Sequence, residues 1–191
     1  YAIRLGKPLI IIFGLGSANG SRTGASPLAE MMENLTKKPN ISVITCMGNE
    51  ANNKCHYKGT VMSALVPDVM EINVDGTGKG FTMEIWADSL DILSVSIESP
   101  SGEYVPRIPA RMGASMEYTF LYEGSTVTVD YQITENVAGM EVIFVRLKTP
   151  VEGTWKFYIY SLTNIKGSYN AWLPLKQFSG QDIYFLKSDP D

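Results

Sequence analysis

From about Val66 to the end of the chain, short segments in which apolar and polar residues alternate follow one another with no helical segment between them. Alternation with a period of two is typical of a strand with one buried face. Glycine-containing turn signals, such as those at Gly76, Gly102 and Gly153, separate the segments. This spacing predicts an antiparallel β-sandwich of the jelly-roll type over residues 65–191. The predicted strands are residues 68–74, 80–86, 91–97, 116–122, 125–131, 140–146, 154–160 and 181–186.

Residues 1–64 have a different pattern. An apolar segment at 8–13 runs into glycines, a helical segment follows at 26–38, and a second apolar segment spans 41–47. Ser26 and Pro27 are suited to begin the helix, and Pro39 to end it. Two buried-type strands joined through a helix indicate a parallel βαβ unit. The predicted fold class is therefore an α/β piece over residues 1–64, followed by the all-β jelly-roll sandwich.

Charge and composition narrow the classes of partner expected for this chain. The net charge is −4, and the 16 lysines and arginines are scattered, so no basic footprint for nucleic acid is present and no nucleic-acid partner is expected. The longest apolar run, residues 8–15, is too short to span a bilayer, and no membrane partner is expected. Because the chain begins with Tyr1 and opens almost at once on a strand, we expect it to be a segment of a longer polypeptide.

The triplet Gly48, Asn49 and Glu50 directly follows the second apolar strand. In α/β enzymes, polar site groups lie at the carboxyl ends of strands. The amide of Asn49 is suited to stabilise an oxyanion in acyl transfer. Asparagine also occurs simply as a turn residue, because it tolerates left-handed backbone conformations. Both readings of Asn49 stay open on the residues alone.

Four motifs together resemble the subtilisin-like serine proteases (subtilases, peptidase family S8) of clostridia and related anaerobes. The group includes spore-germination proteases with a jelly-roll domain inserted after the oxyanion asparagine. The motifs run Pro-Leu-Ile-Ile-Ile from Pro8, Ser-Pro-Leu-Ala-Glu from Ser26, Gly-Asn-Glu-Ala-Asn from Gly48 and His-Tyr-Lys-Gly from His56. They cover residues 8–60; the later region matches in position and strand pattern only.

The resemblance implies roles for individual residues. Asn49 would be the oxyanion-hole donor. Substrate binding would fall to two segments: Gly14, Leu15 and Gly16 as a strand that pairs with substrate, and Cys46, Met47 and Gly48 beside the pocket. This chain departs from the family pattern at Gly14, which replaces a serine, at Cys46 and Met47, which replace alanines, and at Ala51, which replaces a common glycine. The larger side chains are expected to reshape the pocket.

The chain contains none of the motifs that carry the Ser, His and Asp of a catalytic triad. The parent chain is expected to be a serine endopeptidase acting on a peptide or protein substrate, and this segment alone to be inactive.

His56 has no paired nucleophile and is interpreted as structural. No metal site or cofactor is expected, since Cys46, Cys55 and His56 lack ligand spacing. Five acidic residues lack the fixed spacing of a calcium-binding loop and are interpreted as solvated strand ends and turns: Asp68, Glu71, Asp75, Asp88 and Asp91.

Two alternatives remain at this point. The parent is a non-catalytic pseudoprotease, or the sandwich is a carbohydrate- or protein-binding module that uses Trp86, Trp155 or Trp172, of which at least Trp155 is expected to be buried. The isolated segment is expected to self-associate through residues 8–48, because a lone parallel strand pair has open edges. The family resemblance implies an extracellular or spore-associated location.

Overall fold

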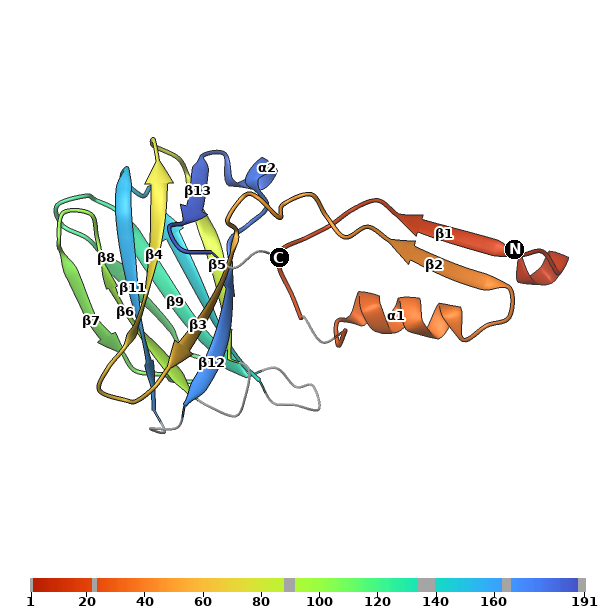
Figure 1. Cartoon of the computed structure of the whole chain (residues 1–191), viewed down its shortest axis with the longest axis horizontal. Helices are drawn as coiled ribbons and strands as arrows, with labels where there is room; N and C mark the ends of the chain where they lie inside the picture. Colours follow the sequence, from red (N-terminus) through yellow and green to blue (C-terminus); the bar gives the residue numbers. More distant parts are fainter. Residues whose placement is uncertain (1, 22–23, 88–91, 134–139, 163–165, 189–191) are drawn as a thin grey trace. The chain divides into compact units, whose positions relative to one another are not determined.

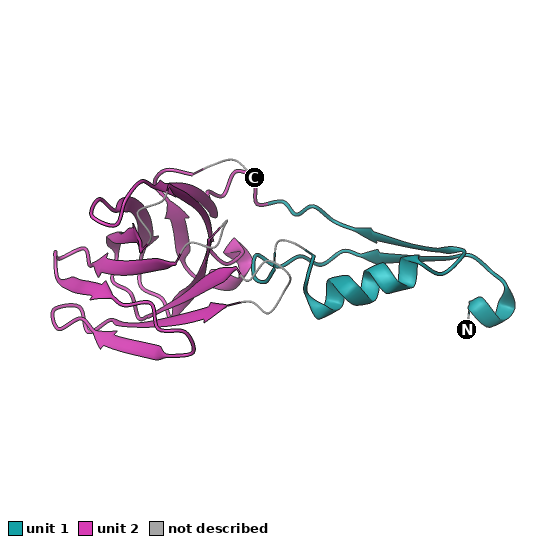
Figure 2. Cartoon of the chain, turned by 90° about the horizontal axis from the view of Figure 1, so that it is seen from below, with its two compact units in different colours: residues 1–49 teal, residues 50–191 magenta. Residues whose placement is uncertain are grey.

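The computed structural model describes residues 2–21, 24–87, 92–133, 140–162 and 166–188 (Figure 1). The chain forms two compact units, residues 1–49 and residues 50–191 (Figure 2). Each unit is described by itself below.

The first unit is small and has almost no buried core. Its elements are η1 (Ile3–Leu5), β1 (Leu9–Phe13), α1 (Pro27–Thr36) and β2 (Ile41–Thr45). The Ser26 side chain caps α1 by accepting a hydrogen bond of 3.2 Å from the Ala29 amide, as its sequence predicts. β1 and β2 pair in parallel, with Leu9 opposite Ile41 and Phe13 opposite Thr45. No residue of α1 is buried.

The predicted fold class is wrong. Among the named strands that the structure describes, parallel pairing is confined to β1 and β2, and the rest of the sheet structure is antiparallel. The physical reason lies in burial: the apolar residues of a parallel α/β sheet need helices on both faces. Here one face of β1 is left open, with Ile12 72% exposed. Two strands and one helix do not make an α/β layer.

The second unit consists of two antiparallel sheets. The six-stranded sheet has the order β3-β12-β5-β10-β9-β8, and the five-stranded sheet has the order β13-β4-β11-β6-β7. Figure 1 shows the two sheets as the layers of this unit. The six-stranded sheet contains β3 (His56–Val61), β5 (Gly80–Ala87), β8 (Ser115–Thr119), β9 (Thr126–Ile133), β10 (Glu141–Lys148) and β12 (Gly167–Trp172). The five-stranded sheet contains β4 (Asp68–Asp75), β6 (Leu93–Glu98), β7 (Tyr104–Ile108), β11 (Gly153–Ser161) and β13 (Asp182–Phe185), and a short helix α2 (Lys176–Ser179) precedes β13.

The inward faces of both sheets form one apolar core. Strand β11 illustrates why: Trp155, Phe157 and Ile159 are fully buried, whereas the residues between them are half-buried on the other face. Burying one large apolar side chain contributes about 1.5–3 kcal/mol, so a core of this size stabilises the unit. In β11, alternation in the sequence therefore identifies the core face of the strand.

Three strands have no predicted counterpart. β7 contains Pro106, which cannot donate a ladder hydrogen bond and is tolerated because β7 lies at the edge of its sheet. β3 and β12 contain glycine and polar residues, and they pair with each other. Residues 56–61, within the predicted N-terminal segment 1–64, thus lie in the six-stranded sheet. The start of the predicted strand 91–97, at Asp91, lies outside the described residues.

Candidate functional site

The segments after β1 and β2 begin side by side. The parallel register places Phe13 opposite Thr45, and the Cys46 amide donates a hydrogen bond of 3.2 Å to the Phe13 carbonyl. Residues 14–16 therefore leave β1 next to the point where residues 46–49 leave β2. This is the carboxyl end of the strand pair, where parallel sheets carry their ligand sites.

The side chains at this end are open to solvent. Leu15 is 85% exposed and Met47 is 101% exposed, and Cys46 is exposed as well. Gly14, Gly16 and Gly48 carry no side chain, so backbone groups are accessible beside these apolar side chains. An extended peptide can pair with such backbone, and its side chains can contact Leu15 and Met47.

Gly48 sets the direction of the chain before Asn49. Its φ is 93°, in the left-handed region that favours glycine. Asn49 is exposed, and its side-chain amide forms no hydrogen bond with the other described residues. The amide is thus open to a ligand at the carboxyl end of β2.

Glu50 fixes the turn that follows. Its carboxylate accepts hydrogen bonds from the Asn53 side chain at 2.7 Å and from the Lys176 amide at 3.4 Å, and its carbonyl accepts one from the Asn53 amide at 2.8 Å. Sequence reasoning named Glu50 only as part of a motif and missed this anchoring role. A carboxylate three residues before an asparagine in a turn was the signal available.

His56 is held by neighbours in its own sheet. Its ring stacks on Trp172, with centroids 4.8 Å apart and planes 12° apart, and its Nε2 lies 2.9 Å from Asn170 Oδ1. These contacts agree with the structural role predicted for His56.

Asp68 joins the two sheets. Its carboxylate accepts hydrogen bonds from the Tyr57 hydroxyl at 3.0 Å and from the Tyr169 hydroxyl at 2.7 Å. Burial, followed by the charge of Asp68, raises the pKa of Tyr169. Within the described ranges, no three His, Cys, Asp or Glu side chains are grouped so as to hold a metal ion. Asp88 and Asp91 lie outside those ranges.

The tryptophans weighed as sugar platforms are largely inaccessible. Trp155 is fully buried, as predicted, and its indole N–H donates to the Val151 carbonyl at 3.1 Å. Trp86 is buried and donates to Glu84 at 3.0 Å. Trp172 is half-buried against His56. This arrangement gives little support to carbohydrate binding by these residues.

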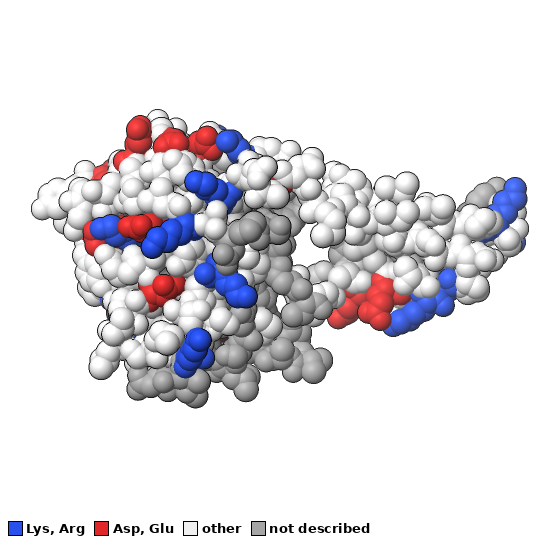
Figure 3. All heavy atoms as spheres, viewed as in Figure 1, with Lys and Arg blue, Asp and Glu red and all other residues white. Residues whose placement is uncertain are grey.

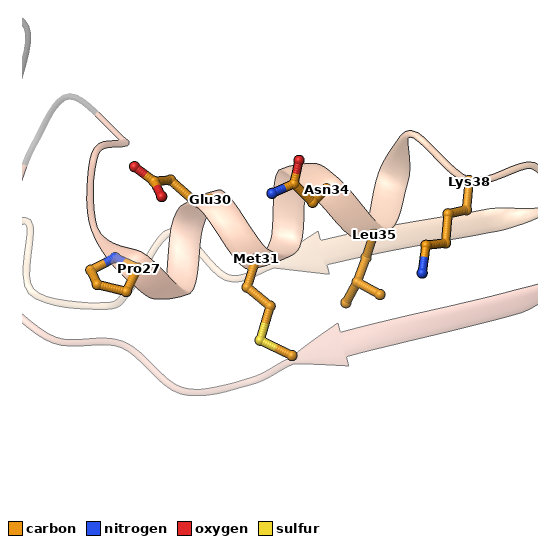
Figure 4. A pocket seen from close by; sticks show the side chains of 6 residues that line it. All are labelled: Pro27, Glu30, Met31, Asn34, Leu35 and Lys38. Atoms are coloured by element: carbon orange, nitrogen blue, oxygen red, sulfur yellow. The ribbon is translucent and has the colours of Figure 1, made fainter.

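A hollow on the surface of α1 carries no catalytic grouping. Figure 4 shows the side chains that line it, with Met31 and Leu35 pointing to the same side of the helix. Its lining residues are Pro27, Glu30, Met31, Asn34, Leu35 and Lys38. Neither a nucleophile nor an acid–base pair is among them. Elsewhere, no helix within the described residues is long and apolar enough to cross a bilayer.

The outer face of the five-stranded sheet carries a polar network that sequence reasoning missed. The Tyr158 hydroxyl donates to Glu98, and Lys156 forms an ion pair with the same carboxylate at 2.9 Å. These two hydrogen bonds, Tyr158 first, lower the pKa of Glu98. The bond to Glu98 also raises the pKa of Tyr158 to about 12. The alternation of β11 was the available signal, since it places Lys156 and Tyr158 on the same outward face.

Comparison with known proteins shows what this chain is similar to. No protein-family model matches it, and no curated protein does. Among solved structures, that of the Clostridium perfringens CspB protease matches with a TM-score of 0.83 and 20% sequence identity. The match covers 98% of this chain and 39% of that chain. The chain thus shares its fold with part of a protease, and it spans well under half of that protein's length.

Proposed function

We propose that this chain is the central part of a subtilisin-like serine endopeptidase, in which Asn49 is the oxyanion-hole donor and residues 14–16 bind the substrate backbone. The observation that carries the proposal is the fold likeness to the CspB protease over 98% of the chain. The four motifs across residues 8–60 support the same assignment independently of the fold.

The geometry is suited to acyl transfer. A peptide paired with residues 14–16 through backbone hydrogen bonds would lie beside residues 46–49, because the two segments start from neighbouring strand ends. Cys46, Met47 and Gly48 would then flank the substrate side chain. The amide of Asn49 would donate to the oxygen of the tetrahedral intermediate, where negative charge develops.

Glu50 would hold this donor in place. It anchors the turn at 50–53 through Asn53 and Lys176, so the chain is fixed from the residue immediately after Asn49. An oxyanion donor stabilises the transition state best when it is positioned before reaction. The second unit then contributes to catalysis by fixing a loop end, and we propose that it packs on the protease body of the parent.

The nucleophile and base would come from parts of the parent outside residues 1–191, since the chain holds no triad motif. The 191-residue chain alone is therefore expected to hydrolyse no peptide. A parent that has lost one of the triad residues would be the pseudoprotease alternative.

The test is Asn49→Ala in the intact parent, assayed on a peptide substrate. We expect kcat to fall by about 10²–10³, the scale known for the same loss in subtilisin, with KM little changed. The reason is that the donor acts mainly in the transition state.

Asn52→Ala is the matched control, because Asn52 is an exposed asparagine of the following turn. It should leave kcat unchanged. An unchanged kcat in Asn49→Ala would reject the oxyanion role, and a parent without peptidase activity would favour the pseudoprotease.

A further inference from the structure

Exposed apolar residues directly follow the two backbone carbonyls that Arg107 binds at one end of the five-stranded sheet. Leu65 is 88% exposed, Val66 is 65% exposed and Leu162 is 57% exposed. We call these three residues and Arg107 the Arg107 patch.

Arg107 holds the parts of this patch together. Its guanidinium donates to the Ala64 carbonyl at 3.3 Å and to the Ser161 carbonyl at 3.4 Å. Leu65 and Leu162 are the next residues in the chain. Two loops far apart in sequence are thereby fixed beside one cation, so the patch is organised before any partner binds.

Side chains of β6 and β11 also orient the guanidinium. Its Nε donates to the Ser94 hydroxyl at 2.6 Å, and its carbon lies 4.7 Å from the centroid of the Tyr160 ring. The Ser96 hydroxyl donates to the Tyr160 hydroxyl at 3.4 Å and accepts from the Tyr104 hydroxyl at 2.7 Å. The tyrosines and serines of β6, β7 and β11 thus form a fixed floor.

Among the residues that the structure describes, no carboxylate balances the charge of Arg107. Its hydrogen bonds go to a hydroxyl and two carbonyls, and none of the ion pairs between described residues includes it. A guanidinium has five N–H donors, so two form no hydrogen bond with the described residues and can bind a ligand. A half-buried cation beside apolar side chains favours binding of an anionic group that is itself flanked by apolar groups.

The position of the patch favours a partner outside this polypeptide. The chain enters and leaves the second unit at one end, where the Phe185 amide donates to the Lys54 carbonyl at 2.9 Å. The patch lies beyond the other end of β3, because His56 pairs with Trp172 and Val61 with Gly167. Six residues of strand separate the two ends by about 20 Å. Within the second unit, the points where the chain enters and leaves thus lie away from the patch.

We propose that the Arg107 patch docks a segment of a separate protein in which an aspartate or glutamate is flanked by aliphatic residues. The carboxylate binds the free donors of Arg107, and the aliphatic side chains pack on Leu65, Val66 and Leu162. Arginine is enriched at the centres of protein interfaces.

The experiment selects random dodecapeptides displayed on phage against the full 191-residue chain. Counter-selection uses the same chain with Leu65→Ser and Leu162→Ser, changes at exposed positions that leave the core intact. Enriched peptides are expected to carry Asp or Glu beside aliphatic residues. The best peptide and its counterpart with the acid replaced by the amide are then compared by calorimetry, and the amide peptide should bind at least about 10-fold more weakly.

Leu121→Ser is the matched control, since Leu121 is 84% exposed in a turn outside the patch, and it should bind the peptide as the unchanged chain does. Arg107→Lys keeps the charge but loses the planar fork, and it should weaken binding while its thermal unfolding checks the fold. The proposal is overturned by three results: no peptide enriched beyond counter-selection, enriched peptides without an acid, or equal binding of the acid and amide peptides. Binding of phosphatidylglycerol vesicles without peptide enrichment would assign the patch to membranes and overturn it too.

Discussion

At the scale of single residues, Glu98 shows how a carboxylate on a sheet surface acquires a role in stability. Its partners Tyr158 and Lys156 bond the charged form, which lowers the pKa of Glu98 from 4.5. Charged residues of both signs are interspersed on the face shown in Figure 3, and most exposed pairs of this kind contribute little. Glu98 differs because its side chain is 25% exposed and a tyrosine hydroxyl shares the carboxylate.

We predict that Glu98→Gln lowers the free energy of unfolding at pH 7 by about 1 kcal/mol. The folded protein holds the proton on Glu98 less tightly than the unfolded chain. The contribution is therefore fully present above the ordinary pKa and is lost as the pH falls through the lowered one. Urea unfolding at pH 7, 5 and 3 should show the two proteins converging at the lowest pH.

Glu152→Gln, at an exposed position, is the control and should change little at any pH. The same mutation of Glu98 should let Tyr158 ionise closer to pH 10, since the bond to Glu98 is the main cause of its raised pKa. Tyrosinate absorbance, with Tyr158→Phe to identify the signal, measures this. A constant stability difference between pH 7 and pH 3 would contradict the assigned role of Glu98.

At the scale of elements, close approach of β5 and β10 requires a glycine at position 80. Gly80 pairs with Lys148, and its φ is 112°. A Cβ at this position would lie 2.0 Å from the Leu147 carbonyl oxygen, which is backbone and cannot move without disturbing the ladder. We predict that Gly80→Ala destabilises the second unit by about 3 kcal/mol or more, of which backbone strain accounts for about 1–3 kcal/mol.

Gly102→Ala tests the effect of backbone strain in the absence of a steric clash. Its φ is 88°, yet a Cβ there meets no atom within 4 Å. It should cost only about 1 kcal/mol. Thermal unfolding of the two variants side by side is the measurement, and equal losses would show that the contact with Leu147 is unimportant.

At the scale of the whole molecule, the two units differ in what they can bury. The second unit holds the core, whereas in the first only Ile41 is buried among the apolar residues described. On the uncovered face of the two-stranded sheet, Ile12 lies opposite Ile44, and Ile10 is exposed beside them. An uncovered apolar face with open strand edges favours association between copies.

We therefore predict that the isolated 191-residue chain self-associates with rising concentration in sedimentation velocity. Ile12→Lys should restore the monomer by placing a charge on the open face. Phe178→Lys, at a position 71% exposed in the second unit, should not. A monomeric chain with slow hydrogen exchange in β1 and β2 would show instead that the first unit is stable alone.

Local sequence patterns are sufficient to identify several strands and the start of α1. Alternation at residues 154–160 identified β11 and its core face, and Ser26 with Pro27 identified the start of α1. The order strand, helix, strand also anticipated that residues 14–16 and 46–49 leave neighbouring strands. These features depend on contacts near in sequence or on the period of one strand, and a single sequence carries both.

Other features of the fold depend on contacts between segments far apart in the chain. β7, with Pro106, and β12, with its polar residues, are strands because neighbours in the sheets supply their hydrogen bonds. The fold class was mispredicted because whether two parallel strands become an α/β layer depends on what covers their faces, and that is a non-local property. Arg107 joins Ser94, Ala64 and Ser161 across long separations in the chain. Its role follows from packing that no local pattern specifies.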